Sequence, residues 1–272
     1  MAGLPIMRPT DRRDLIIDLV RERERVTVDY LAQTLTTSCE TIRRDLTELA
    51  ARGLVRKFHG GATSLDLANA GAKIEGSFQT RMQEHLREKR AIARCAASLF
   101  SPGDTLFIDT GTTTVIFAEE LARLSRLTVI TNSIAIAQTI ARGAEGNRVF
   151  LVGGEYSDDA AENVGTLAVE QISRFRTAYA VLTVGAIEAH GAMDYDLHET
   201  EVAIAMVAQA RNVTILADSS KLGRAGLFHV CTLADIDRLV VDAPPEGAID
   251  GALRSAGVEI VVAPQPDILK IV

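Results

Sequence analysis

One segment in the second half of the chain combines the features of an anion-binding loop. Leu106–Asp109 is typical of a short strand that ends on a carboxylate, Gly111 and three threonines (112–114) follow, and Val115–Leu124 has a helical pattern. Backbone N–H groups and the dipole of a helix N-terminus favour an anion there, and threonine hydroxyls add donors. The Gly-Lys-Ser/Thr ending of a Walker A loop is missing. The segment predicts a phosphate site, with a tight turn capped by threonines as the alternative.

Other predicted strands in this half of the chain also end in glycine or polar residues. Ligands of open α/β sheets bind outside the carboxyl ends of the strands, so we expect these residues on the rim of one crevice. They are Asn132, Gly153, Gly154, Gly185 and Lys221. Lys221 could supply a point charge for a phosphate or carboxylate. Ordinary turn glycines and an exposed lysine are the alternative.

A predicted helix near Asp194–Glu201 opens with acidic residues. Asp196, His198 and Glu199 could contact sugar hydroxyl groups, or they could serve only as negative charge at a helix N-terminus. The other four histidines and the three cysteines are scattered along the chain. Because no metal-ligand spacing occurs, we predict neither a metal nor a cofactor.

The N-terminal part of the chain carries a different chemistry. A helix is predicted over Cys39–Ala51, where Ile42, Leu46 and Leu49 lie at i, i+4 and i+7 and make one apolar face. Arginine can read guanine edges, and threonine or serine can bind phosphate or a thymine methyl group. The residues expected to reach DNA from the N-cap and the outward face of this helix are Ser38, Glu40, Thr41, Arg43 and Arg44.

Shorter elements surround this helix. Asp11–Arg23 and the segment around Tyr30–Leu35 each have one apolar face, Thr36–Ser38 is a turn, and Gly53 is placed to end the third helix. Two helices, a turn and a third helix make helix-turn-helix geometry, in which the last helix enters the major groove.

A strand over Leu54–Phe58 and a turn at His59–Gly61 follow, which indicates a hairpin wing. Three wing residues, Arg56, Lys57 and His59, are expected to contact phosphates. A three-helix bundle with solvated arginines, in which Arg44 pairs with Glu40 at i, i+4, explains the same pattern.

The second half of the chain alternates helices, including one predicted over Glu84–Leu99, with short apolar strands. The strands are predicted at Thr105–Asp109, Leu127–Thr131, Arg148–Val152, Ala178–Val184, Val213–Ala217, Arg238–Val241 and Val258–Val262. Such alternation favours βαβ units around a largely parallel sheet. We therefore expect a winged helix-turn-helix domain over 1–63, a linker over 64–76 and an α/β domain over 77–272.

Composition restricts the class of protein. The chain has 272 residues, of which 47% are hydrophobic and 24% charged, as in globular proteins with a large core. The net charge is −7, but residues 1–63 hold 11 Arg and Lys against 9 Asp and Glu, so the acidic excess lies in the remainder. Neither a signal peptide nor an apolar run of about 18 residues occurs. We expect a cytoplasmic protein with reduced cysteines.

Two sets of motifs, taken together, resemble a known family. They are Tyr30–Leu35, Ser38–Leu49 and Gly53–Ala62 in the first part, and Phe78–Arg81, Glu88–Ala93, Ile108–Thr113, Val129–Asn132, Gly153–Gly154 and Asp218–Lys221 in the second. Over nearly its whole length the chain is similar to DeoR-family bacterial transcriptional regulators. It departs from the family at Thr36-Thr37, where a Gly-Val-like pair is common.

The resemblance implies a repressor of sugar or glycerol catabolism genes that binds double-stranded operator DNA. It also implies a sensor domain resembling sugar-phosphate isomerases, with a phosphorylated sugar or polyol held by the Asp109–Thr113 loop and Lys221. The residues predicted to form the effector site are Asp109, Gly111, Thr112, Thr113, Thr114, Asn132, Gly153, Gly154, Gly185, Asp196, His198, Glu199 and Lys221.

Some residues are similar to a subgroup of the family that responds to glycerol 3-phosphate, the effector that we therefore favour over other sugar phosphates. They are Thr105–Asp109, Asp196, His198-Glu199, Ser220–Arg224 and Asp242–Pro245.

A sugar-phosphate isomerase with a DNA-binding arm is the alternative function. Isomerisation needs a positioned acid and base, but no constellation in the chain compels that chemistry, and an enzyme has no use for a recognition helix. We predict no enzymatic activity and no catalytic residue. Because one helix-turn-helix makes too small an interface for a specific site, we expect a homo-oligomer, dimer or tetramer, held by the C-terminal domain.

Overall fold

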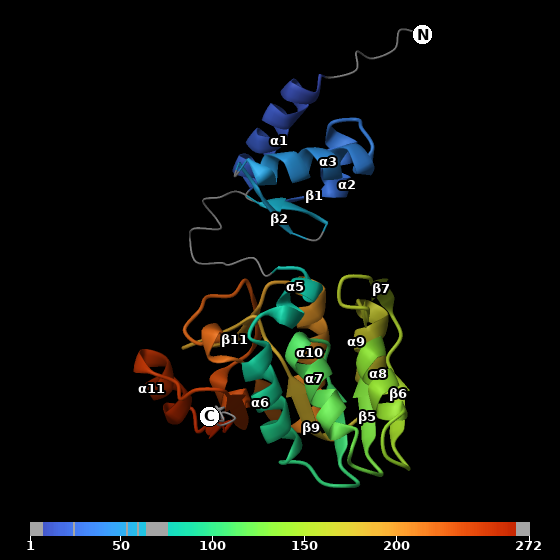
Figure 1. Cartoon of the computed structure of the whole chain (residues 1–272), viewed down its shortest axis with the longest axis vertical. Helices are drawn as coiled ribbons and strands as arrows, with labels where there is room; N and C mark the ends of the chain where they lie inside the picture. The colour runs from blue at the N-terminus through green and yellow to red at the C-terminus, as the bar shows by residue number, and fades with distance from the viewer. Residues whose placement is uncertain (1–7, 24, 53, 59, 64–75, 265–272) are drawn as a thin grey trace, which may run out of the picture. The chain divides into compact units, whose positions relative to one another are not determined.

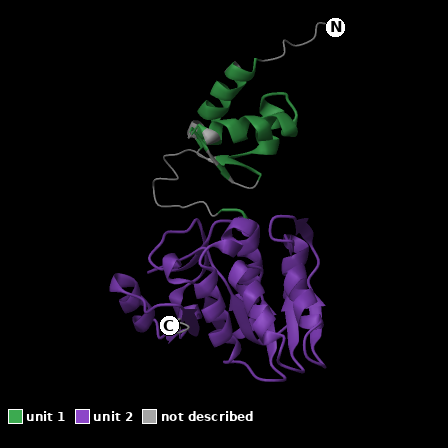
Figure 2. Cartoon of the chain, in the orientation of Figure 1, with its two compact units in different colours: residues 1–77 green, residues 78–272 purple. Residues whose placement is uncertain are grey.

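The computed structural model describes residues 8–23, 25–52, 54–58, 60–63 and 76–264. The chain divides into two compact units, Met1–Ser77 and Phe78–Val272, which Figure 2 colours separately. Of the linker predicted over 64–76, only Gly76 is among the described residues. Each unit contains its own hydrophobic core.

Unit 1 is a winged helix (Figure 1). Its elements are α1 (Pro9–Arg23), β1 (Arg25–Thr27), α2 (Val28–Thr34), α3 (Cys39–Ala51), β2 (Arg56–Phe58) and β3 (Gly61–Thr63). The strands form an antiparallel sheet in the order β1-β3-β2. The predicted apolar faces are buried in one core, where Leu31, Ile42 and Leu49 are fully covered. The predicted wing strand is shorter than expected, because β2 begins only at Arg56, and Gly53 lies outside the described residues.

Unit 2 is built on a seven-stranded sheet in which every neighbouring pair is parallel. In sheet order the strands are β15 (Glu259–Val262), β14 (Arg238–Val241), β12 (Ala210–Leu216), β9 (Thr177–Leu182), β4 (Thr105–Ile108), β5 (Thr128–Thr131) and β6 (Arg148–Leu151). All seven correspond to the strands predicted from the sequence. The largely parallel α/β fold is therefore confirmed.

Helices cover both faces of this sheet. Successive side chains of each strand therefore enter two separate cores, one on each face. Leu106 and Ile108 of β4 lie in one core, and Phe107 lies in the other. The first core contains residues of α6 (Leu86–Ala97), α7 (Thr112–Leu121) and α8 (Ile134–Ala141), which lie next to one another (Figure 1). The second contains residues of α9 (Thr166–Ile172), α10 (Leu197–Gln209) and α11 (Gly247–Ser255).

Smaller elements, which the residue pattern did not predict, complete unit 2. They are α5 (Phe78–Gln83), the antiparallel hairpin β7 (Glu155–Ser157) and β8 (Glu162–Val164), the antiparallel sheet β10 (Ala186–Glu188), β11 (Gly191–Asp194) and β13 (Phe228–Cys231), and the 3-10 turns η1 (Ser219–Lys221) and η2 (Leu233–Asp235). Among the described residues, no helix has the length and apolar character needed to cross a membrane.

Three predicted helix boundaries are wrong. The helix expected over Glu84–Leu99 is interrupted at His85, whose positive φ of 52° separates α5 from α6. The threonines at 112–114 form the first turn of α7 rather than a loop before it. Asp194 belongs to β11, so α10 begins only at Leu197.

Candidate functional site

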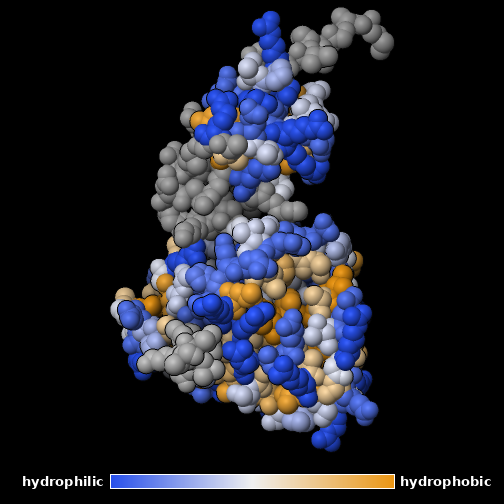
Figure 3. Space-filling model, viewed as in Figure 1, coloured by the Kyte–Doolittle hydropathy of each residue, from blue (hydrophilic) through white to orange (hydrophobic). Residues whose placement is uncertain are grey.

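Helix α3 presents a polar face outward from unit 1. Ser38 caps its N-terminus, since the Ser38 hydroxyl accepts a hydrogen bond from the Thr41 N–H at 3.2 Å. The side chains of Glu40, Arg43 and Arg44 are exposed, as predicted. In Figure 3, blue hydrophilic residues dominate the visible surface of this unit. The face therefore offers the donors and positive charge that a nucleic acid requires.

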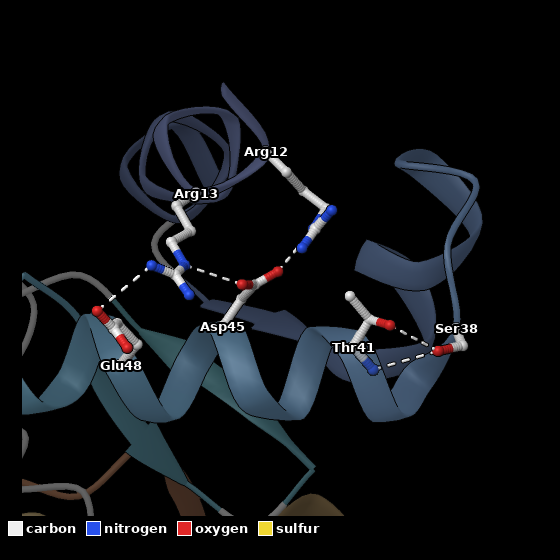
Figure 4. Close-up of polar contacts among 6 residues, drawn as sticks. All are labelled: Arg12, Arg13, Ser38, Thr41, Asp45 and Glu48. Atoms are coloured by element: carbon white, nitrogen blue, oxygen red, sulfur yellow. Dashed lines mark hydrogen bonds and ion pairs between the residues drawn. The ribbon is translucent and has the colours of Figure 1, made fainter. Parts of the chain in front are cut away.

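A buried carboxylate fixes this helix against α1. Asp45 is 2% exposed, and its two oxygens accept hydrogen bonds from Arg12 Nε at 2.6 Å and Arg13 Nε at 2.9 Å (Figure 4). Arg13 also lies 3.3 Å from a Glu48 oxygen. Because these ion pairs join the first and third helices, they set the angle at which the outward face of α3 is presented. Sequence periodicity predicted the apolar contacts of this helix but not this ion-pair cluster.

The wing is tied to the same helix. Lys57 of β2 donates a hydrogen bond through Nζ to the Thr47 hydroxyl at 2.8 Å. The Arg56 side chain and all of His59 lie outside the described residues. Arg44 Nε lies 3.3 Å from Glu40 Oε1, which is the i, i+4 pair that the alternative interpretation expected. Such an exposed pair is weak, so it does not prevent Arg44 from binding another acceptor.

The start of α7 lies at the carboxyl edge of the large sheet. Gly111 precedes the helix and gives it no side-chain cap. A Cβ at Gly111 would lie 2.0 Å from Thr183 Oγ1, so only glycine fits without a shift of that side chain. The side chains of Thr112 and Thr113 are buried, and the Thr114 hydroxyl donates to the Gly111 carbonyl at 3.0 Å. The first turn therefore has an uncapped, closely packed N-terminus, which favours an anion.

Asp109 lies at the end of β4, beside this turn. It is 6% exposed, and both carboxyl oxygens lie 3.1 Å from the Thr183 N–H, which donates to them. Burial raises the pKa of Asp109 well above its usual range, the Thr183 hydrogen bond opposes that shift, and the nearby carboxylates of Asp194 and Glu162 raise the pKa further. Asp109 thus contacts backbone of the adjacent strand, so its first role is to hold β9 and β4 together at this edge.

Two lysines, Lys221 and Lys89, lie near one another at the carboxyl edge of the large sheet. Lys221, in η1, donates a hydrogen bond through Nζ to the Val184 carbonyl, and Val184 directly follows Thr183. Lys89 of α6 is 3% exposed and donates to the Arg81 carbonyl. Burial lowers the pKa of Lys89, and the positive charge of Lys221 lowers it further. Lys89 was not among the predicted site residues, although its motif was part of the family resemblance.

Asn132, at the end of β5, leads to a residue that sequence reasoning missed. Its Nδ2 donates to Glu162 Oε2 at 2.9 Å, and Glu162 of β8 is 1% exposed. Burial raises the pKa of Glu162 to about 7. Burial likewise raises the pKa of Glu199, and the nearby Glu162 charge adds to that shift. Glu162 sits in the polar stretch Asp158–Asn163, whose composition resembles a surface loop, so no local signal indicates its burial.

The remaining predicted residues make local structural contacts. Asp196 caps α10, since its Oδ1 accepts hydrogen bonds from the N–H groups of His198 and Glu199. The His198 side chain is 59% exposed and lies 3.6 Å from Glu201. Asp196 therefore stabilises the N-terminus of α10.

The three glycines are closely packed. The Gly153 N–H donates to the Gln171 side chain at 3.1 Å. A Cβ on Gly154 would meet the Val164 carbonyl at 2.5 Å, and one on Gly185 would meet the Tyr195 ring at 2.6 Å. In the part of the chain that the structure describes, no group of three or more His, Cys, Asp and Glu residues is arranged to hold a metal ion.

A winged helix with an exposed polar third helix, followed by an α/β unit with charged residues at the carboxyl edge of its sheet, defines a DNA-binding regulator with a sensor domain. The family model for the DeoR-like helix-turn-helix domain matches residues 12–67, and the model for the DeoR C terminal sensor domain matches residues 84–243. The chain belongs to the DeoR family of transcriptional regulators.

Curated relatives cover nearly the whole chain. The HTH-type transcriptional repressor CsqR of Escherichia coli is 33% identical over 94% of this chain and 96% of its own length. The glycerol-3-phosphate regulon repressor of the same organism is 31% identical over 93% of this chain and 99% of its own length. The repressor GlcR of Bacillus subtilis is 32% identical over 96% of this chain and 99% of its own length.

Among solved structures, ribose 5-phosphate isomerase A of Methanocaldococcus jannaschii covers 51% of this chain and 55% of its own. The sequence identity is 16% and the TM-score is 0.37, which supports no inference about activity.

Proposed function

We propose that this protein is a ligand-controlled repressor. Residues 1–63 bind double-stranded operator DNA, and a phosphorylated metabolite that binds unit 2 releases the DNA. The observation that carries the proposal is the outward face of α3, where Arg43 and Arg44 are exposed on a helix fixed by Asp45. The three curated relatives described above are named repressors, which supports the same sign of regulation.

Removal of one arginine tests the DNA-reading role. Arg44→Ala should weaken specific operator binding by about 1–3 kcal/mol if Arg44 reads a base edge. Arg174→Ala is the matched control, since Arg174 is an exposed arginine in the turn after α9 in unit 2. Band shifts at one fixed salt concentration measure both variants. Equal operator affinity for Arg44→Ala and the control would show that Arg44 does not contact a base edge.

The phosphate of the effector is proposed to bind at the uncapped first turn of α7. Gly111 lets the chain approach closely there, and Thr183 and Val184 connect this turn to Lys221 on the same edge. Positive charge from Lys221 and Lys89 favours an anion on that side. Glycerol 3-phosphate is the favoured effector, because one relative is named for the glycerol-3-phosphate regulon.

Calorimetry and band shifts, with glycerol 3-phosphate, glycerol and several sugar phosphates side by side, test this site. Glycerol 3-phosphate should bind and lower operator affinity, because an effector releases DNA only if it binds the DNA-free conformation better. Lys221→Ala should abolish the response and leave DNA binding intact, whereas Arg174→Ala should change neither. Binding of glycerol alone would contradict the phosphate site. Turnover of a sugar phosphate would instead support the isomerase alternative.

The proposed repressor acts as a homo-oligomer, dimer or tetramer, assembled through unit 2. The support is physical, since a single helix-turn-helix usually binds paired half-sites as a dimer. Light scattering at micromolar concentration, with and without operator DNA, should show an oligomer. A monomer under both conditions would contradict the proposal.

A further inference from the structure

Glu162 reaches the carboxyl edge of the sheet from a hairpin outside the sheet. Backbone bonds hold β8 against the end of β5: the Ile134 N–H donates to the Ala161 carbonyl at 3.2 Å, and the Asn163 N–H donates to the Asn132 carbonyl at 2.9 Å. Ser133 and Glu162 form an antiparallel bridge. The residues immediately before and after Glu162 are therefore both hydrogen-bonded to the segment that follows β5, which fixes the backbone position of Glu162.

The groups that face Glu162 and its partner Glu199 are mostly acidic. Glu199 comes from α10 and Asp196 from its N-cap, while Asp109 follows β4 and Asp194 belongs to β11. The positive charge of Arg81, on α5, acts on Glu199. The Asn132 amide donates to Glu162, and the Thr110 hydroxyl lies near it. A second anion brought into this cluster meets repulsion from these carboxyls, which the positive charge of Arg81 offsets in part.

A buried acceptor beside Glu162 indicates that a ligand completes this cluster. Asn132 is 1% exposed, and its Nδ2 donates to Glu162 and to the Asn163 carbonyl. Its Oδ1 is also buried, and no group in the described part of the chain donates to it. An orphaned buried acceptor is costly. A ligand hydroxyl that donates its one proton to this oxygen would satisfy it, and a second hydroxyl of the same ligand would donate to the neighbouring carboxylates.

We propose that Glu162 is a specificity-determining residue that accepts the uncharged, hydroxyl-bearing end of the effector and excludes ligands that are anionic at both ends. The inference rests on the proposed function, in which the phosphate end binds at the start of α7 and beside Lys221. The edge is then bipolar: the lysine side binds the anion, and the Glu162 side binds hydroxyl groups. The effector class is a monophosphate of a neutral polyol or sugar.

Two probes that differ at one end test the proposal by calorimetry on the full chain. Glycerol 3-phosphate ends in a hydroxymethyl group, and 3-phosphoglycerate ends in a carboxylate. The wild-type protein should prefer glycerol 3-phosphate, and Glu162→Gln should reduce this preference at least about tenfold, because the amide keeps the size of the side chain and removes its charge. Glu170→Gln, an exposed glutamate on α9, is the control and should leave the preference unchanged.

The preference for glycerol 3-phosphate over 3-phosphoglycerate is also measured at a series of pH values, because a variant that merely failed to fold would not reproduce its pH dependence. Since burial raises the pKa of Glu162 to about 7, the wild-type preference should grow as pH rises through that value and Glu162 ionises. The preference of Glu162→Gln should change less, and both probes carry the same phosphate, whose own ionisation therefore cancels. Glu199→Gln is the second variant and should act in the same direction.

The outcomes separate the two proposals. If glycerol 3-phosphate binds but Glu162→Gln and Glu199→Gln both keep the wild-type preference at every pH, the role of Glu162 is overturned and the sensor site stands. If neither probe binds the wild-type protein and a ligand anionic at both ends does, the proposed effector and the role of Glu162 both fall.

Discussion

Each unit of the chain buries a carboxyl group almost completely, and the two differ in what surrounds them. Asp45 in unit 1 is 2% exposed and accepts hydrogen bonds from two arginines, at 2.6 and 2.9 Å. Glu162 in unit 2 is 1% exposed and accepts from a neutral amide, among further carboxyls. A buried charge is tolerated when it is paired, and otherwise the group tends to take up a proton.

The difference shows how one side-chain chemistry serves two purposes. The charge of Asp45 is matched within the fold, so this residue joins helices and has little left to offer a ligand. The charge of Glu162 is unmatched, so burial raises its pKa to about 7 and the residue stays responsive to protons and donors. Buried ionisable side chains without a partner of opposite charge often lie in functional sites, whereas those with such a partner more often have a structural role.

The largest expected effect is at Asp45. Asp45→Asn should destabilise unit 1 by about 3 kcal/mol, because both arginines lose their buried partner. The measurement is hydrogen exchange of peptides from α1 and α3 in the full chain, which reports local stability. The control is Asp250→Asn, which removes the i, i+4 partner of the exposed Arg254 in α11 and should change the exchange of α1 and α3 little. Similar protection in both variants would show that the Asp45 ion pairs contribute nothing measurable.

Glu162 should behave in the opposite way, with a dependence on pH. A carboxyl whose pKa is raised on folding stabilises the folded state below its unfolded value, 4.5, and this contribution is lost as pH rises through about 7. Glu162→Gln cannot ionise, so unit 2 of this variant should gain on the order of 2 kcal/mol over wild type between those limits. Urea unfolding at several pH values measures the gain. Parallel stability curves for the two proteins would contradict the burial of an unmatched charge.

The smallest effect concerns the start of α3. Ser38→Ala removes the hydrogen bond to the Thr41 N–H and should cost about 1 kcal/mol of local stability. Ser38→Asp restores an N-cap acceptor and should restore the protection of Cys39–Asp45 in hydrogen exchange. If both variants lose the same protection, the cap is not what stabilises this end. The result would sharpen the contrast with α7, whose first turn begins at Gly111 without a side-chain cap.

The sequence predicted those parts of the fold in which apolar spacing decides the structure. The inner strands of the parallel sheet, such as β4 and β9, are apolar runs because they are buried on both faces, and α3 has an apolar residue on every turn. The hairpin β7–β8 and the strands β10, β11 and β13 lack that signal, since they are short and mixed in polarity. Their positions depend on tertiary contacts such as the bridge between Ser133 and Glu162.

The sequence likewise predicted those residues of the candidate site whose position follows from the order of strands, and it missed those whose position depends on tertiary contacts. Strand ends located Asp109, Asn132 and Lys221, because the carboxyl edge of a parallel sheet is a property of topology. Glu162 was missed because burial, not residue type, gives it its properties. His198 is the converse case: its residue type suggested contact with a ligand, and the structure places its side chain in an exposed position beside Glu201.

The hairpin that carries Glu162 is not part of the seven-stranded sheet, so the position of Glu162 can change while the sheet stays the same. Its register pairs Ser157 with Glu162 and Tyr156 with Asn163, across the short loop 158–161. Successive residues of a strand point to opposite faces, so a slip of one residue would turn Glu162 away and bring Asn163 in. A carboxyl would then be exchanged for an amide without any change in the seven-stranded sheet. If Glu162 has the proposed role, insertions and deletions at the tip of this hairpin give evolution a route to new effector preferences without a change in unit 1 or at the start of α7.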